Sequence, residues 1–167
     1  MAAQRSIRKG IGNSARSKFA RRPAVRAVIR NARVEDAAAL KKLLLGLGYA
    51  SSLGQVRRRI AETASASDTA IFVAEGERAV LGIVSIHCLP LLHTEGKLGR
   101  ITSLVVAPGF RQRGVGKALV AAVEKFARQR GCARLEVTSG DQRSEAHAFY
   151  ESMGFRRTSQ RFIKHGP

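Results

Sequence analysis

The sequence lacks several features, and each shortage excludes a class of protein. It has no tryptophan and two cysteines, Cys88 and Cys132, which are too few for a disulfide scaffold. No Cys-x-x-Cys pair or His/Cys cluster indicates zinc, so we expect no metal site and two inert thiols in a reducing compartment. No apolar run approaches the roughly 20 residues of a membrane-spanning helix. Residues 1–20 also lack the apolar stretch of a secretory signal, so a cytoplasmic protein is expected.

Acidic residues are missing from the first fifth of the chain. Residues 1–33 hold ten of the 30 Lys and Arg and no Asp or Glu, within a net charge of +18. Such an arm suits contact with nucleic acid phosphates or an anionic membrane surface. It also resembles a mitochondrial transit peptide, and it is equally compatible with a solvated extension. These alternatives stay open, and we expect a basic extension over residues 1–24 and one domain over residues 25–167.

Apolar periodicity predicts an α/β domain with a mixed sheet and helices on both of its faces. The predicted order is β-α-α-β-β-β-α-β-α-β. A helix opens at Glu35 and another is capped by Ser52 with Gln55 three residues on. The longest helix follows Val115 and is capped by Gly131, and a short one covers residues 144–153. Strands are expected over 25–29, 70–74, 79–86, 101–106, 135–138 and 155–163, with a loop over 87–97.

A glycine-containing turn joins the strand that ends at Val106 to the longest helix. Its sequence is Arg111-Gln112-Arg113-Gly114-Val115-Gly116-Lys117. A helix start presents unpaired N–H groups at the positive end of the helix dipole, and glycine lets the backbone approach an anion. The spacing fails both the Walker A and the Rossmann patterns. We therefore predict a pyrophosphate site of another kind.

The pattern R-x-x-G-x-G after three strands resembles the pyrophosphate loop of the GNAT superfamily of N-acetyltransferases. Two more segments are similar to that family: Ser103 to Pro108 before the loop, and Ala146 to Phe155 with its Tyr and Gly-Phe. Most members carry Asp where Ala107 stands. The resemblance covers roughly residues 28–163 and is strongest over Ile101 to Phe155.

This resemblance implies a GNAT-like fold that binds acetyl-CoA and transfers an acetyl group directly to a primary amine. It implies a cofactor site formed by the strand before the loop, the loop itself and the start of the next helix. Many relatives carry Asn where Arg143 stands, so Arg143 and His147 are expected at CoA phosphates or at the substrate. The residues expected to bind the cofactor are Leu104, Val105, Val106, Arg111, Gln112, Arg113, Gly114, Val115, Gly116, Lys117, Arg143 and His147.

Acetyl transfer needs a base for the amine, a donor for the oxyanion and an acid for the leaving thiolate. The resemblance places Tyr150 near the CoA sulfur as the acid, and a backbone N–H of Val105 or Val106 at the oxyanion. Glu136 resembles a strand glutamate that acts as base through water, with a salt bridge to a neighbouring arginine as the alternative. His87 and His93 are further candidates for the base.

The sequence leaves the amine acceptor unidentified: it can be a small molecule or a protein, and the loops 48–52 and 87–97 show no readable pattern. Two other functions stay open, namely a nucleic-acid-binding protein that uses the basic arm and an acyl-CoA-binding fold without catalysis. The shortage of aromatic residues disfavours the first, and the intact Tyr150 disfavours the second. We expect a homodimer, formed through residues 155–162 or through the arm.

Overall fold

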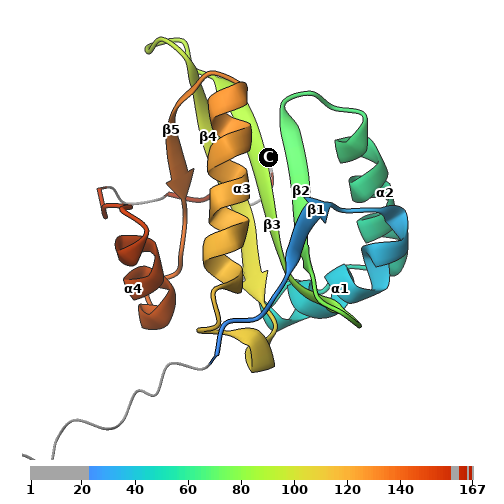
Figure 1. The fold of residues 1–167 in the computed structure, drawn as a ribbon. Coiled ribbons are helices and arrows are strands. Elements are labelled where there is room, and N and C mark those ends of the chain that lie inside the picture. The colour runs from blue at the N-terminus through green and yellow to red at the C-terminus, as the bar shows by residue number, and fades with distance from the viewer. Residues whose placement is uncertain (1–22, 159–161, 165, 167) are drawn as a thin grey trace, which may run out of the picture.

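Five strands form one mixed sheet in the computed structural model, which describes residues 23–158, 162–164 and 166. The strands lie in chain order across the sheet (Figure 1). Among the first four, each strand runs antiparallel to its neighbour, and the fifth runs parallel to the fourth. Their bounds are β1 Val28–Asn31, β2 Thr69–Glu75, β3 Val80–Pro90, β4 Lys97–Val106 and β5 Cys132–Val137.

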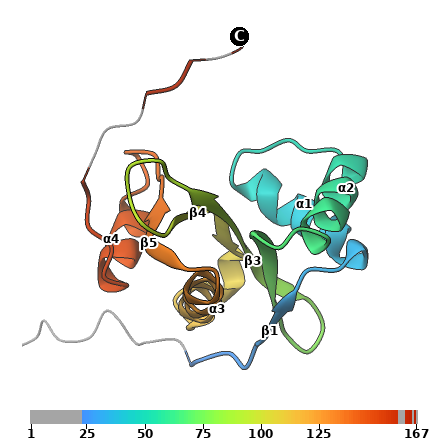
Figure 2. The same cartoon turned by 90° about the horizontal axis from the view of Figure 1, so that it is seen from above.

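Helices cover both faces of the sheet, as the sequence predicts. α1 (Ala37–Gly46) and α2 (Leu53–Ala64) pack on one face, and α3 (Val115–Gln129) crosses the other (Figures 1 and 2). α4 (Ser144–Ser152) lies beside α3 near β5. Two short turns, η1 (Val34–Asp36) and η2 (Pro108–Phe110), precede α1 and α3. No described helix is both long and apolar enough to cross a membrane.

The apolar stripe of α3 supplies much of the core on its face of the sheet. Val115, Leu119 and Val123 are at most 2% exposed and pack against residues of β2, β3 and β4. Burial of each such side chain contributes about 1.5–3 kcal/mol to folding. The predicted capping box of α2 is confirmed, because Ser52 N donates to Gln55 Oε1 (2.8 Å) and Gln55 N donates to Ser52 Oγ (3.1 Å).

Two boundaries differ from the prediction for physical reasons. The first strand begins at Val28 rather than Val25, because the Val25 N–H donates to the Arg113 carbonyl (3.2 Å) and not to β2. The expected loop over 87–97 shrinks to residues 91–96, because β3 runs on to Pro90 and β4 begins at Lys97 in register with it. The hairpin is thus tighter than its proline and glycine suggest.

The prediction of a last strand over 155–163 is wrong for those of its residues that the structure describes. A strand exists only through pairing with a neighbour, and residues 155–158 and 162–164 pair with none. Phe155 packs on Tyr150 instead, while Phe162 and Ile163 are exposed. Residues 159–161 of this prediction, and nearly all of the basic extension, lie outside the described residues.

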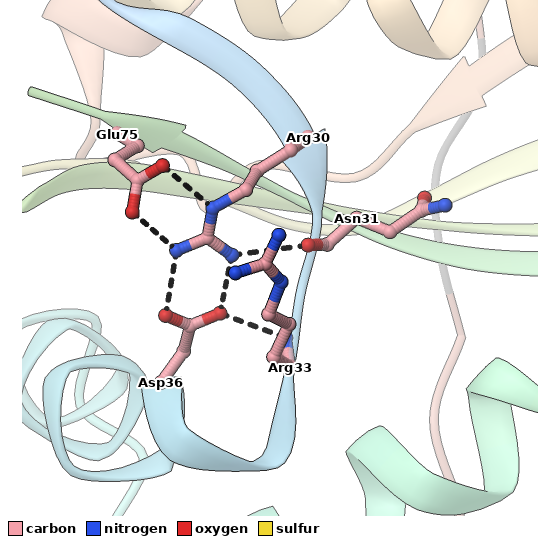
Figure 3. Close-up of polar contacts among 5 residues, drawn as sticks. All are labelled: Arg30, Asn31, Arg33, Asp36 and Glu75. Carbon is pink, nitrogen blue, oxygen red and sulfur yellow. Dashed lines mark hydrogen bonds and ion pairs between the residues drawn. The ribbon is translucent and has the colours of Figure 1, made fainter.

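A charged cluster joins β1, η1 and β2 (Figure 3). Arg30 donates to Asp36 Oδ2 (2.7 Å) and Oδ1 (2.9 Å) and to Glu75 Oε1 (2.7 Å) and Oε2 (2.9 Å), while Arg33 N donates to Asp36 Oδ2 (2.7 Å). Asp36 is buried, and the hydrogen bond from Arg30 lowers the pKa of its carboxyl below the ordinary 3.8. The cluster thereby fixes the start of α1 against the edge of the sheet.

We predict that Asp36→Asn lowers the free energy of unfolding at pH 7 by about 2–3 kcal/mol, since it leaves a partly buried guanidinium with one charged partner. A carboxylate whose pKa is lowered by folding stabilises the protein above its ordinary pKa, and this contribution is lost as the pH falls through the folded value. The difference between wild type and variant therefore shrinks progressively as the pH falls below the ordinary 3.8.

Urea unfolding at pH 7 and pH 3 measures both effects. The matched control is Asp68→Asn, which removes a half-exposed ion pair with Lys97 (2.7 Å) and should cost less than about 1 kcal/mol. Equal losses for the two variants at pH 7 would show that the cluster does not hold α1.

Candidate functional site

A gap opens between β4 and the edge strand β5, halfway along β4. The two strands pair from Lys97 and Cys132 as far as Ile101 and Val137, where β5 ends while β4 continues to Val106. At the same level β4 carries a bulge, because Ser85 of β3 pairs with Ser103 and Ile86 pairs with Ile101, which leaves Thr102 extra. A bulge bends its strand and disrupts the ladder. Residues 102–106 therefore pair with no described strand on the β5 side, and the bulge bends β4 at the point where that pairing stops.

The register of β4 decides which backbone groups face this gap. Ala107 N donates to the Leu81 carbonyl of β3 (2.8 Å). Successive strand residues direct their N–H groups to opposite sides, so the N–H of Val105 also points to β3. Those of Leu104 and Val106 point into the gap. Of the two predicted oxyanion donors, the register favours Val106.

The glycine turn lies where β4 leaves the sheet. The first helical hydrogen bond of α3 runs from Ala118 N to the Gly114 carbonyl (3.1 Å), and the N–H groups of residues 115–117 donate to no backbone acceptor in the described chain. Gly114 has a φ of +88°, which favours glycine, and a Cβ there would meet open space. Gln112 holds a φ of +58° without being glycine, a strain that concentrates at ligand sites.

Two arginines of the turn are held by backbone carbonyls. Arg111 Nε donates to the Val106 carbonyl (3.2 Å), and Arg113 Nε donates to the Pro23 carbonyl (3.0 Å). With the bond from Val25 N to the Arg113 carbonyl, residues 23–25 are tied to the turn. These contacts fix the shape of the turn and keep its positive charge beside the unpaired N–H groups.

An aromatic cluster on α4 borders the same region. Tyr150 makes edge-to-face contacts with Phe149 (5.4 Å between ring centroids) and Phe155 (5.6 Å). The Phe149 ring lies against Gly116, where a Cβ would be 3.2 Å from it. Burial raises the pKa of Tyr150 above its ordinary 10.0, against an opposing effect from Arg143, so the phenol is protonated at neutral pH. The sequence did not single out Phe149, although an aromatic residue facing a glycine is the kind of pair that locks two helices.

Arg143 and His147, predicted to contact CoA phosphates or the substrate, make contacts within the protein. Arg143 Nη2 donates to the Leu47 carbonyl at the end of α1 (2.8 Å). His147 Nε2 lies 3.0 Å from the Gly140 carbonyl. Arg143 therefore spans from the start of α4 to the α1–α2 loop, one of the loops expected to meet the acceptor.

Glu136 lies on the face of the sheet opposite α3, one residue before the gap. Its Oε1 accepts from Arg134 Nε (3.0 Å), and its Oε2 lies 3.7 Å from Arg100 Nη2. The salt bridge considered as an alternative is thus present, and it involves two arginines. His87 pairs with Arg100 in register on the same face, since its neighbours Ile86 and Cys88 belong to the core under α3.

His93 lies at the opposite end of the molecule from the glycine turn. It is exposed in the turn 91–96, whose Gly96 packs against Gly131 after the end of α3. A 15-residue helix is about 22 Å long, so this end is remote from the start of α3. His93 is therefore badly placed as the base.

A separate pocket of about 240 Å³ also lies near the far end of α3. It is lined by residues of α2, β2 and α3 that include Thr63, Thr69, Phe126 and Arg130. None of its lining residues comes from the glycine turn, β4 or β5. This cavity therefore contains none of the residues predicted to bind the cofactor or to act in catalysis.

Residues 39–155 match the acetyltransferase (GNAT) family. The chain belongs to this family. Acetyl-CoA is the acetyl donor for GNAT enzymes. The glycine turn fits that donor, because it combines three cationic side chains with three N–H groups that have no backbone acceptor in the described chain, as a pyrophosphate requires.

Individual relatives are similar to this chain over different lengths. The aminoalkylphosphonate N-acetyltransferase of Salmonella typhimurium is 36% identical over 85 residues, 51% of this chain and 55% of that protein. The aminoglycoside N(6')-acetyltransferase type 1 of Stenotrophomonas maltophilia is 30% identical over 136 residues, 79% and 88% of the two chains. A solved aminoglycoside N-acetyltransferase in complex with CoA shares the fold, with a TM-score of 0.75 at 19% identity over 84% of this chain and 95% of that one. The chain spans 40% to 58% of the length of the first three curated relatives.

We predict that Gly116→Trp weakens acetyl-CoA binding at least about 100-fold, because the indole would have to occupy the space between the turn and Phe149. Isothermal titration calorimetry measures the dissociation constant. Gly109→Ala is the matched control, since a Cβ there meets nothing within 4 Å, and it should stay within about twofold of wild type. Unchanged affinity in Gly116→Trp would move the cofactor site away from this turn.

Proposed function

We propose that the protein is an N-acetyltransferase that moves an acetyl group from acetyl-CoA directly to a primary amine of a small molecule or protein. One observation carries the proposal: a helix start whose N–H groups have no backbone acceptor among the described residues adjoins a strand edge that pairs with no described strand. The first suits a pyrophosphate and the second suits an extended amide-containing arm. Acetyl-CoA has both chemical groups and supplies an activated thioester.

In this proposal the cofactor-binding residues fall into three groups. Residues 104–106 of β4 present backbone groups to the arm, and residues 111–117 surround the pyrophosphate. Arg143 and His147 stay proposed as cofactor residues, provided that their side chains leave the Leu47 and Gly140 carbonyls on binding. Val106 N–H stabilises the oxyanion that forms at the carbonyl under attack.

Tyr150 acts as the general acid in this proposal. Its raised pKa keeps the Oη proton in place at neutral pH, and a phenol of that acidity can donate to a thiolate of pKa about 8.5. The contacts of its ring with Phe149 and Phe155 fix the ring beside the glycine turn. The proton therefore starts close to the predicted position of the leaving sulfur.

We expect Tyr150→Phe to lower kcat about 100-fold while acetyl-CoA affinity stays within about threefold, because only the hydroxyl is removed. In the wild type, kcat should fall only as the pH rises through the raised Tyr150 pKa, above 10.0, and the variant should lack this alkaline limb. Thiol release across pH 6–10.5 measures both, with circular dichroism as a check of folding. A variant with wild-type kcat would exclude Tyr150 as the acid.

Glu136 is proposed to take the amine proton through a water molecule. It lies one residue before the gap, on the face that α3 leaves free. Two guanidinium groups already bind its carboxylate oxygens, which leaves them less free to hold the water molecule. Its contribution should accordingly be smaller than that of an unpaired carboxylate.

We expect Glu136→Gln to lower kcat about tenfold, at the low end of general base catalysis because of the ion pairs. Stopped assays of acetyl transfer at pH 7 measure this. Were kcat unchanged, Glu136 would be an ion-pair partner only, and His87 would be the next residue to test.

The assembly is part of the proposal. We propose a homodimer, supported by the free edge of β5 and by the exposure of Phe162 and Ile163. A basic extension over residues 1–24, a catalytic domain over 25–167 and a cytoplasmic location complete it. The names of the relatives point to different acceptors, an aminoalkylphosphonate and an aminoglycoside, so they do not select one for this chain.

A further inference from the structure

Among the described residues, no helix packs on the sheet face opposite α3 over Arg100 of β4 and Arg134 of β5, and arginines line this open face. α1 and α2 pack against Val73, Ile83 and Val105, which belong to β2, β3 and the end of β4. Beyond them the face carries Arg100, whose side chain is 38% exposed, and Arg134, which is 49% exposed. An amine that reaches the gap must come from this side, because α3 and α4 occupy the other (Figure 2).

Positive charge exceeds negative charge on this open face. Arg100 and Arg134 share one carboxylate, that of Glu136, so the three side chains carry a net charge of +1. Arg100 Nη1 donates to Thr138 Oγ1 (3.0 Å), which holds its guanidinium in place. Arg134 uses only Nε, and its two terminal nitrogens have no partner in the described part of the chain. Those nitrogens form the planar fork that binds a carboxylate or phosphate through two hydrogen bonds.

Arg143 adds a second uncompensated charge near the α1–α2 loop. Its partner there is the neutral Leu47 carbonyl. The nearby carboxylate of Asp141 is already taken by Arg157 (2.6 Å). A polycationic acceptor would therefore meet repulsion, whereas an anionic group would find free donors.

We propose that the amine acceptor carries an anionic group, a phosphonate, phosphate or carboxylate, which Arg134 and Arg100 bind. The inference rests on the proposed acetyl transfer and names its substrate class. Arg100 and Glu136 form the pair directly before the last pair of β4 and β5. An acceptor held there places an amine on a short arm at the mouth of the gap, with its anionic end on the arginines and its amine near Glu136.

Four primary amines with the same two-carbon arm test this directly: 2-aminoethylphosphonate, β-alanine, ethanolamine and ethylenediamine. Binding is measured by NMR titration of the full chain, with and without CoA, at two ionic strengths. We expect the phosphonate or the carboxylate, or both, to bind at least about tenfold more tightly than ethanolamine, and ethylenediamine to bind most weakly. The comparison of phosphonate with carboxylate tells which anion the site prefers. The values of kcat/KM should follow the same order.

Arg134→Ala should bring the ratio of the affinities for the phosphonate and for ethanolamine close to one. Arg134→Glu should reverse the order of affinities, so that ethylenediamine binds more tightly than the phosphonate. Arg128→Ala is the control, because Arg128 is an exposed arginine on α3, away from the open face. It should leave the ratio unchanged. Arg134 is half-exposed, so these variants are expected to fold, which circular dichroism checks.

The inference is overturned if ethanolamine or ethylenediamine binds as tightly as both anionic amines, or if Arg134→Ala leaves their ratio unchanged. The proposed function fails separately, if acetyl-CoA does not bind or if no thiol is released with any amine. The arginines are present without cofactor, so the binding order of the four amines decides the acceptor class in either case.

Discussion

The separation of β4 from β5 is the constraint on which the rest of the site depends. A continuous ladder would use up the backbone groups of Leu104 and Val106, and no extended ligand could pair with them. The bulge at Thr102 prevents this, at the same level at which β5 ends. The strand then leads directly into η2 and the glycine turn, so a single irregularity positions both the strand edge and the helix start.

The walls of the gap are held by different kinds of interaction. On the α3 side, the contacts are aromatic and apolar, with Phe149 against Gly116 and Tyr150 between two phenylalanines. On the opposite side, α1 is fixed through the charges of Arg30, Asp36 and Glu75, and the face beyond it is lined by arginines (Figure 3). The apolar side therefore suits the thioester of the proposed donor, and the charged side suits a polar amine.

The sequence was most informative where local chemistry determines structure. The capping box of Ser52, the stripe of α3 and the glycine turn depend on residues within a few positions of each other, and all three could be predicted. Pairing across the sheet could not, because register depends on partners distant in sequence. The last strand failed for this reason. The salt bridge of Glu136 with the neighbouring Arg134 was considered as an alternative, whereas its second partner and that of Arg143 were beyond reach, since Arg100 lies on another strand and Arg143 bonds a residue 96 positions away.

The bonds that join Pro23 and Val25 to Arg113 have a consequence for the path of the chain. The first described residue, Pro23, therefore lies beside the glycine turn. A bulky group attached to residue 23 would crowd the nucleotide site proposed at this turn. Placed there, a fluorophore would instead act as a local reporter of its occupancy.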